Sequence, residues 1–150
     1  MKYSLNIGGR KVCLLYDMVA NDEIEAHDWG FPVGDGENEQ PSGFDAMVTA
    51  WNTPRRMTET ALDLLVILAN NAAEVAGQPA DLDKTWVKRH IHPGGMKMIN
   101  EALRMCIRDA MRRTLEDPCE DEEHDVVLEE IEAKKDEAEG SAADGSTALD

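Results

Sequence analysis

The chain has 150 residues, 42% of them hydrophobic, and a formal net charge of -16 at pH 7, a size that allows one modest domain with its own core. Residues 116–150 hold 15 acidic residues and two lysines, a net of -13, whereas the first 115 residues carry a net of -3. Because sequence-independent binding to phosphates needs clustered Lys and Arg, nucleic acid is not an expected partner. The apolar runs are shorter than the roughly 20 residues that span a bilayer, so no membrane segment is expected.

The first predicted element is a β-hairpin over residues 2–16. Hydrophobic and polar residues alternate on both sides of Gly8-Gly9, a pair that favours a tight hairpin turn. An isolated two-stranded hairpin is marginal in water, so we expect its apolar face to pack on helices. Asp17 is placed to cap a short helix from Met18 to about Ala26.

Residues 27–42 are predicted to form a long loop, because glycines and prolines surround an acidic centre. We expect Trp29 and Phe31 to anchor the first part of this loop to the domain. Ser42 is a candidate cap for a short helix that extends through Trp51.

The most apolar stretch, residues 57–76, predicts a central helix. Thr53-Pro54 is typical of a helix start, and Gly77 is typical of a helix stop. A wide apolar stripe indicates a helix surrounded by other elements of the core. At helical spacing this stripe contains Met57, Ala61, Leu64, Leu65, Leu68, Ala72 and Val75.

Two further helices are predicted downstream. Asp81 or Asp83 is placed to cap a short helix that carries Trp86. Pro93 then opens a long final helix, which Pro118 ends. The predicted inward stripe of this final helix is Met96, Ile99, Leu103, Ile107, Ala110 and Met111.

The remainder, residues 117–150, is predicted to be an acidic, largely disordered tail, because it is low in apolar residues and rich in Gly, Ser, Ala and Asp. Within it, one or two amphipathic turns could form around Val126, Val127, Leu128 and Ile131. The predicted fold class is therefore α+β and mostly α. In residues 1–116 an N-terminal β-hairpin packs on a small helical bundle, and the tail follows.

Residues that carry chemistry do not form a recognisable motif. His90 and His92 have no further ligands at a metal-binding spacing. Three widely spaced cysteines, Cys13, Cys106 and Cys119, are typical of a reducing cytoplasm rather than of a disulfide framework. Serine-nucleophile, phosphate-loop and HExxH patterns are also missing from the sequence. We predict a protein without catalytic residues, metal or cofactor; a small enzyme that uses His90, His92 or a cysteine is the alternative.

The outer edge of the final helix suggests a partner-binding role. Arg104, Arg108 and Arg112 lie along it at helical spacing, which is also typical of a solvated face whose late cations complement the helix dipole. A second interpretation is that the acidic tail folds back over these arginines until a partner displaces it. Methionines beside them would give an adaptable contact surface. The candidate partner-binding residues are Trp86, Met98, Arg104, Met105, Arg108 and Arg112.

Three stretches follow one another as hairpin, central helix, and Trp-bearing helix joined to a longer helix. They read YSLNIGGRKVCLLYDM, TPRRMTETALDLLVILANNA and ADLDKTWVKRHIHPGGMKMINEALRMCIRDAMRR. This layout, over about residues 1–115, resembles the tail assembly chaperones of long-tailed bacteriophages and prophages.

The resemblance implies a non-enzymatic protein of the bacterial host cytoplasm that is absent from the mature virion. It would bind the tape measure protein and help recruit tail tube subunits, and it could form an oligomer. Such families often make a longer product by ribosomal frameshifting, for which the codons of Ala133-Lys134-Lys135 are a candidate slippery site. The alternative to this function is an acidic adaptor, or nucleic-acid mimic, that occupies a basic protein partner.

Overall fold

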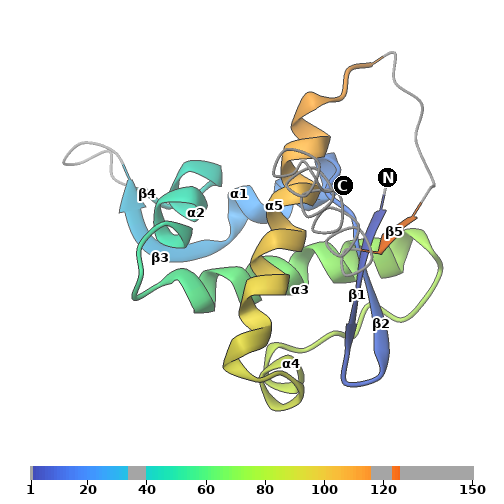
Figure 1. Ribbon diagram of the computed structural model, residues 1–150. Coiled ribbons are helices and arrows are strands. Elements are labelled where there is room, and N and C mark those ends of the chain that lie inside the picture. The colour runs from blue at the N-terminus through green and yellow to red at the C-terminus, as the bar shows by residue number, and fades with distance from the viewer. Residues whose placement is uncertain (1, 34–39, 116–122, 126–150) are drawn as a thin grey trace, which may run out of the picture.

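The computed structural model describes residues 2–33, 40–115 and 123–125 (Figure 1). Within them, an N-terminal antiparallel hairpin and five α-helices confirm the predicted mostly helical α+β class. In chain order the elements are β1 (Lys2–Ile7), β2 (Arg10–Leu14), α1 (Met18–Ala26), β3 (Asp28–Val33), β4 (Gln40–Ser42), α2 (Phe44–Trp51), α3 (Met57–Val75), α4 (Lys84–His90), a 3₁₀ turn (Pro93–Gly95), α5 (Met96–Arg112) and β5 (Glu123–Asp125).

The hairpin forms where the alternating pattern predicts it. β1 and β2 pair antiparallel from Tyr3 with Leu14 to Ile7 with Arg10. Gly8 and Gly9 adopt φ angles of 56° and 79°, left-handed values that glycine reaches without a steric cost. The inward side chains Tyr3, Leu5, Ile7, Val12 and Leu14 are all buried. The hairpin therefore packs its apolar face on the helices, as expected.

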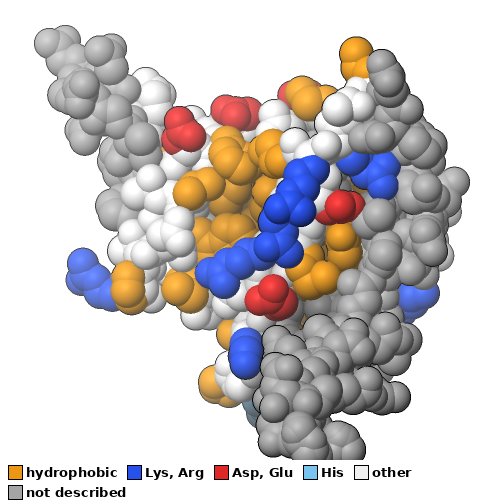
Figure 2. Space-filling model, turned by 45° about the horizontal axis from the view of Figure 1, so that its top comes forward, with side chains coloured by type: hydrophobic (Ala, Val, Ile, Leu, Met, Phe, Trp, Pro, Cys, Tyr) orange, Lys and Arg blue, Asp and Glu red, His pale blue; other side chains and the backbone are white. Residues whose placement is uncertain are grey.

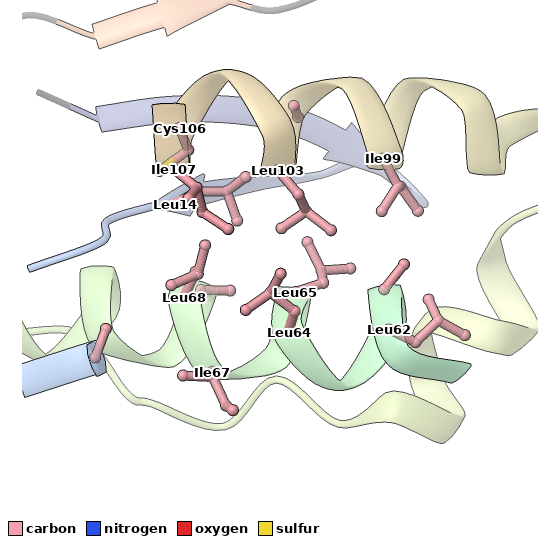
Figure 3. Packing of buried hydrophobic residues seen from close by; sticks show 14 of the residues in the cluster. Leu14, Leu62, Leu64, Leu65, Ile67, Leu68, Ile99, Leu103, Cys106 and Ile107 are labelled. Carbon is pink, nitrogen blue, oxygen red and sulfur yellow. The ribbon is translucent and has the colours of Figure 1, made fainter. Parts of the chain in front are cut away.

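The core lies between α3, α5 and the hairpin (Figure 3). Leu62, Leu65 and Leu68 of α3 face Leu103 and Ile107 of α5 across the interior. The apolar stripes predicted for α3 and α5 include residues at the C-terminal end of each helix that are not buried. Both helices extend beyond the core there. Val75 of α3 is 64% exposed and Met111 of α5 is 57% exposed.

The helix starts differ in part from the prediction. Asp17 and Asp83 do cap their helices, accepting hydrogen bonds from the backbone N–H groups of Ala20 and Trp86 at 3.0 and 3.1 Å. Thr53 is not the cap of α3, which begins after Arg56; its hydroxyl instead donates to the Thr49 carbonyl at 2.8 Å and prolongs the end of α2. Ser42 does not cap α2 either, because Gly43 occupies that position.

Residues 27–42 are only partly a loop. β3 and β4 form an antiparallel pair from Asp28 with Ser42 to Val33 with Gln40, with an irregular register between them. Residues 34–39 and the Phe31 side chain lie outside what the structure describes, whereas Trp29 is 1% exposed and anchors the segment as expected. The Gly and Pro content hid these strands, since a two-stranded ribbon tolerates such residues better than a central strand does.

The C-terminal end differs more strongly. α5 ends at Arg112, before the predicted stop at Pro118. β5 lies inside the predicted tail and pairs parallel with β1, giving a three-stranded sheet in the order β2-β1-β5 (Figure 1). The predicted disorder of residues 117–150 and the predicted turn around Val126–Ile131 otherwise concern residues 116–122 and 126–150, which lie outside the described part.

Candidate partner-binding surface

The outward face of α5 carries a row of exposed arginines. Arg104, Arg108 and Arg112 follow one another at four-residue spacing, so the row extends over about 12 Å of helix. Figure 2 shows Lys and Arg side chains crossing this face, with hydrophobic side chains on both sides of them. We call Arg104, Arg108 and Arg112 the arginine row.

One side of the arginine row is fixed to α2 through Trp51. The Arg104 guanidinium carbon lies 5.4 Å from the centre of the Trp51 ring, a cation–π contact. The Trp51 indole N–H donates to Asn100 Oδ1 at 2.7 Å, and the Asn100 side-chain amide donates to the Met96 carbonyl at 2.9 Å. Trp51, Asn100 and Arg104 therefore hold the row at a fixed place beside α2.

The other side of the row carries the two predicted methionines. With 3.6 residues per turn, Met98 and Met105 lie roughly 150° around the helix axis from Asn100. Both are half-buried and pack against the core rather than standing fully exposed. The structure therefore places five of the six candidate residues on one helix face, with apolar side chains flanking the arginines.

Trp86, the sixth candidate, lies elsewhere. Its ring stacks on His90 at 4.2 Å between centroids, and the Arg10 guanidinium carbon is 5.5 Å from it. His90 also contacts the hairpin turn, since a Cβ added at Gly8 would lie 2.7 Å from its ring. Trp86 therefore belongs to a contact between α4 and the hairpin.

The arginine row has no acidic counterpart among the described residues. Among the described residues of α5, Asp109 pairs with Arg113, the residue that follows the helix, at 3.9 Å. Glu101, half-buried on the same helix, is not within 4.0 Å of an arginine in the row. An acidic chain thus presents three adjacent positive charges that its described part leaves without ion pairs.

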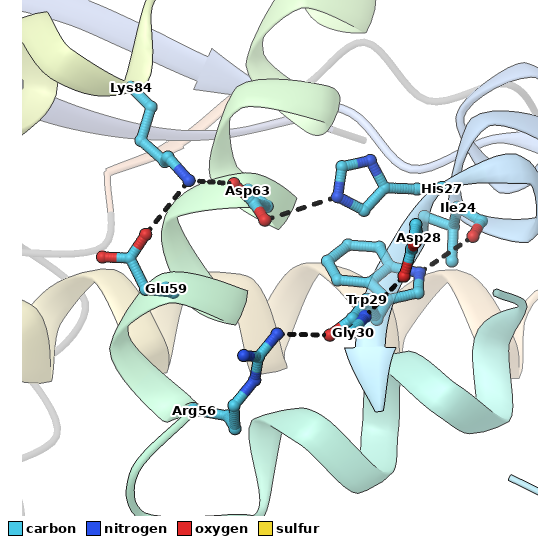
Figure 4. Close-up of polar contacts among 9 residues, drawn as sticks. All are labelled: Ile24, His27, Asp28, Trp29, Gly30, Arg56, Glu59, Asp63 and Lys84. Atoms are coloured by element: carbon cyan, nitrogen blue, oxygen red, sulfur yellow. Dashed lines mark hydrogen bonds and ion pairs between the residues drawn. The ribbon is translucent and has the colours of Figure 1, made fainter. Parts of the chain in front are cut away.

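The charges between α3 and α4, in contrast, are paired with one another (Figure 4). Lys84 Nζ lies 3.0 Å from Glu59 and 2.8 Å from Asp63, and Lys88 Nζ lies 2.7 Å from Glu59. Asp63 also meets His27 Nε2 at 3.3 Å. Hydrogen bonds from Lys88 and Lys84 lower the pKa of Glu59, and the hydrogen bond to Asp63 raises the pKa of Lys84. This cluster ties α4 and the end of α1 to α3.

Trp29 completes the same side of the molecule. Its indole N–H donates to the Ile24 carbonyl at 3.0 Å, and its own carbonyl accepts from Arg56 Nη2 at 2.7 Å (Figure 4). The His27 ring lies 4.3 Å from the Trp29 ring, between centroids. Each polar group in this region has a local role in holding β3 against α1 and α3.

The described histidines and cysteines that could serve a small enzyme do not form a reactive group. His90 Nδ1 bonds to the Trp86 carbonyl at 2.8 Å. Burial raises the pKa of Cys106 to about 12, so this thiol stays protonated. Among the described residues, no group of three or more His, Cys, Asp or Glu side chains is arranged to hold a metal ion. The described helices also include none that is both long and apolar enough to cross a membrane.

Two hollows in the surface of the described residues are further candidate sites. The larger, about 440 Å³, lies between α3 and the start of α5 and is mostly apolar, with Lys88 and His92 at its edge. The second, about 270 Å³, lies between β2 and the C-terminal half of α3. In the second hollow Arg10 and Asp81 pair with each other at 2.8 Å, and Lys11 lies beside them. The arginines of the row make no such ion pair within the described part of the chain, so the row remains the stronger candidate for binding a partner.

Comparisons with protein-family models, with curated proteins and with solved structures find no match to this chain. The resemblance to phage tail assembly chaperones therefore stays a prediction from the sequence.

Proposed function

We propose that this protein is a non-enzymatic tail assembly chaperone of a long-tailed bacteriophage or prophage. The observation that carries the proposal is the arginine row with apolar borders on a helix whose opposite face is fully packed. Ile99, Leu103 and Ile107 hold that helix on the core, so the surface is preorganised for a partner and binding costs little further ordering.

The chemistry of this surface fits an amphipathic helix with an acidic edge. Apolar side chains of such a helix would contact the half-buried Met98 and Met105 beside the row, and its carboxylates would pair with the arginines. Methionine is flexible and polarisable, so it adapts to a client whose sequence varies along its length. A long helical tape measure protein is a client of this kind.

In this proposal the protein works in the cytoplasm of the bacterial host. It keeps the tape measure protein soluble, helps recruit tail tube subunits, and leaves before the virion is complete. These roles come from the resemblance of the sequence layout, and the genes beside its own provide the first check. The proposal requires a neighbouring gene for a long, helix-rich tape measure protein.

The direct test is co-purification of the full chain with that neighbouring protein. The variant Arg104→Glu/Arg108→Glu reverses two charges of the row, and Arg55→Glu/Arg89→Glu reverses two exposed charges elsewhere. We expect at least about tenfold weaker binding for the first variant, as for loss of two charge pairs at an interface centre, and wild-type binding for the second. Equal binding by the two variants, with unchanged circular dichroism, would contradict the proposed site.

The acidic tail supports a second candidate, an adaptor or nucleic-acid mimic for a basic protein. Its net charge of -13 over 35 residues is the observation that favours it. Replacing all 15 Asp and Glu residues between positions 116 and 150 by Asn and Gln distinguishes the two candidate functions. Binding to the partner is lost if the tail is the contact, and is kept if the arginine row is the contact.

A further inference from the structure

A hollow at the start of α5 lies at the end of the arginine row. Counting back from Arg112 in steps of four residues gives Arg108, Arg104, Asn100 and Met96, so these side chains follow one ridge of the helix surface. Met96 lines the larger of the two hollows, which has a volume of about 440 Å³ and which we call the α5 hollow. A helix that packs along the arginine row and extends toward the start of α5 therefore reaches this hollow.

The interior of the α5 hollow is mostly apolar. Its apolar lining consists of Leu62 of α3, Ile91 and Pro93 of the connection between α4 and α5, and Met96. Leu62 is only 2% exposed, and Figure 3 shows it at the same end of the core as Ile99 of α5. The size of the hollow falls within the roughly 300–1,000 Å³ of common ligand pockets, so it has room for one large apolar side chain.

Hydrogen bonds hold the walls of the hollow in place. The backbone N–H of Gly95 donates to the His92 carbonyl at 2.7 Å and closes the 3₁₀ turn before α5. The Met96 carbonyl accepts from the side-chain amide of Asn100 at 2.9 Å, and Asn100 Oδ1 accepts from the Trp51 indole at 2.7 Å. The hollow is therefore already formed, and a side chain that enters it requires little further ordering.

The charges along this side of α5 favour a partner with acidic residues beside its apolar ones. Lys97 follows Met96 directly, is exposed, and has no ion pair with another described residue. From Lys97 to Arg112 the exposed cations extend over about 22 Å of helix. They outnumber Glu101, the half-buried carboxylate on the same side. An acidic helix edge thus meets positive charge from the hollow to the end of the row.

We propose that the α5 hollow binds one bulky apolar side chain, a Leu, Phe or Trp, of the helix whose carboxylates pair with the arginine row. This inference rests on the proposed function and adds the residue pattern that the client must carry. Met96 and Arg104 are about 12 Å apart along the axis of α5. The client helix therefore has its apolar anchor about eight residues from the nearest of two or three acidic residues, which repeat every three to four positions.

The hollow fixes a register that the arginine row alone leaves open. Because the arginines are equally spaced, carboxylates that are shifted by one helical turn would pair with them almost as well. A single apolar side chain fits the hollow in one position only, and its burial strengthens binding in that register about ten- to hundredfold. The hollow is thus the specificity determinant, whereas the arginines attract and orient the partner.

The test measures binding of fluorescein-labelled peptides to the full chain by fluorescence anisotropy. Each peptide has about 24 residues, enough for an Ala-rich helix to form, and carries three glutamates at four-residue spacing. A Phe lies about eight residues before the glutamates in one peptide and about eight residues after them in the other, which covers both directions of the client helix. Replacing this Phe by Ala should weaken binding of at least one peptide about ten- to hundredfold.

Two matched variants of the protein locate this effect. Thr58→Phe fills the hollow from its α3 wall, so the Phe peptide should then bind less than about threefold more tightly than its Ala counterpart. Thr85→Phe makes the same change at an exposed position of α4 that does not line the hollow, and it should leave the difference between the peptides as in the wild type. Circular dichroism checks that both variants fold.

Equal binding of the Phe and Ala peptides to the wild type would overturn the proposal, as would a Phe effect that persists in Thr58→Phe. Self-association of the wild type that Thr58→Phe abolishes, measured by sedimentation, would identify a second copy of the chain as the occupant and overturn it too. Arg104→Glu/Arg108→Glu separates this proposal from the proposed function. If that variant binds more weakly but the Phe has no effect, the row stands and the hollow fails. If the Phe keeps its effect and that variant binds like the wild type, the hollow stands and the row fails.

Discussion

Two polar regions of this molecule differ in whether their charged side chains form ion pairs. Between α3 and α4, Glu59, Asp63, Lys84 and Lys88 neutralise one another within 2.7 to 3.0 Å. On α5, the arginine row faces outward, and the described residues supply no carboxylate within ion-pair distance. The first region uses charge to join elements of the fold, whereas the second keeps charge available for something that binds from outside.

This difference in charge pairing suggests that the arginine row serves binding, whereas the charges between α3 and α4 serve the fold. Polar contacts that link α3, α4 and the chain after α1 help to position the helices relative to one another. Arg108 and Arg112, in contrast, form no ion pair with another described residue, so neutral residues at these two positions should serve folding about as well.

A substitution in the core that both regions share should lower the stability of the whole domain. Leu65 is 0% exposed at the centre of α3, so Leu65→Ala loses its burial and leaves a cavity, at a cost of about 2–5 kcal/mol in the free energy of unfolding. Urea denaturation followed by circular dichroism measures this cost. The control Val75→Ala lies on the same helix at 64% exposure and should change stability by less than about 0.5 kcal/mol.

A buried amide joins the hairpin and α1 to α3, on the side of the molecule where polar groups are paired. Asn71 Nδ2 donates to the Leu15 carbonyl at 3.0 Å and to Asp17 Oδ1 at 2.9 Å. Asn71→Ala leaves both acceptors without this donor, so we expect a loss of about 1–3 kcal/mol. The same denaturation experiment tests it. A change as small as that of Val75→Ala would mean that water replaces the amide.

Breaking the paired cluster should cost less and should depend on pH. Lys84→Met removes the partner of Glu59 and Asp63; since these side chains are partly exposed, the loss at neutral pH should stay below about 1 kcal/mol. The lowered pKa of Glu59 contributes stability above its unfolded pKa, and this contribution disappears as pH falls through the folded value. The stabilities of wild type and variant should therefore converge in acid, as measured by urea denaturation across pH 3–7.

For Lys84 the sign is opposite. Its raised pKa contributes stability below the unfolded lysine pKa, and that contribution is lost as pH rises through the folded value. The difference between wild type and Lys84→Met should thus shrink at both ends of the pH range and be largest between them. A difference that stays constant from acid to alkali would show that packing, rather than charge, accounts for it.

The smallest stability effect is expected on α5. Arg108→Gln and Arg112→Gln remove charges that have no ion pair in the described structure, so the free energy of unfolding should change by less than about 0.5 kcal/mol. Partner binding should nevertheless weaken. This combination, unchanged stability with reduced binding, is the opposite of the result expected for Lys84→Met, which should leave binding intact.

The sequence predicts elements well where one side of an element is buried. Alternation over residues 2–16 and the wide apolar stripe of residues 57–76 both express burial directly, so the hairpin and α3 appear where expected. Asp17 and Asp83 act as caps because their short carboxylates reach the free N–H groups of the next turn. Thr53 has the same local chemistry but bonds backwards to α2, a choice that depends on how the preceding helix ends.

Local sequence patterns do not predict contacts between residues that are far apart in the chain. The parallel pairing of β5 with β1 joins positions more than a hundred residues apart, and a three-residue strand has no periodicity of its own to reveal it. Arg104, Arg108 and Arg112 could be placed on one face by counting, whereas their contact with Trp51 required the α2–α5 packing. The surroundings of Trp86 also depend on the packing of distant elements, because its ring lies against Arg10 and His90.

The three tryptophans give this protein a built-in set of optical reporters. Trp29 and Trp86 each lie next to a histidine ring, at 4.3 and 4.2 Å between centroids, whereas the ring of Trp51 has an arginine over it. Emission from Trp29 should report on the packing of β3, emission from Trp86 on the contact between α4 and the hairpin, and emission from Trp51 on binding at α5. Variants that keep a single tryptophan would therefore allow each of these contacts between elements to be followed separately by fluorescence, in real time and without an added dye.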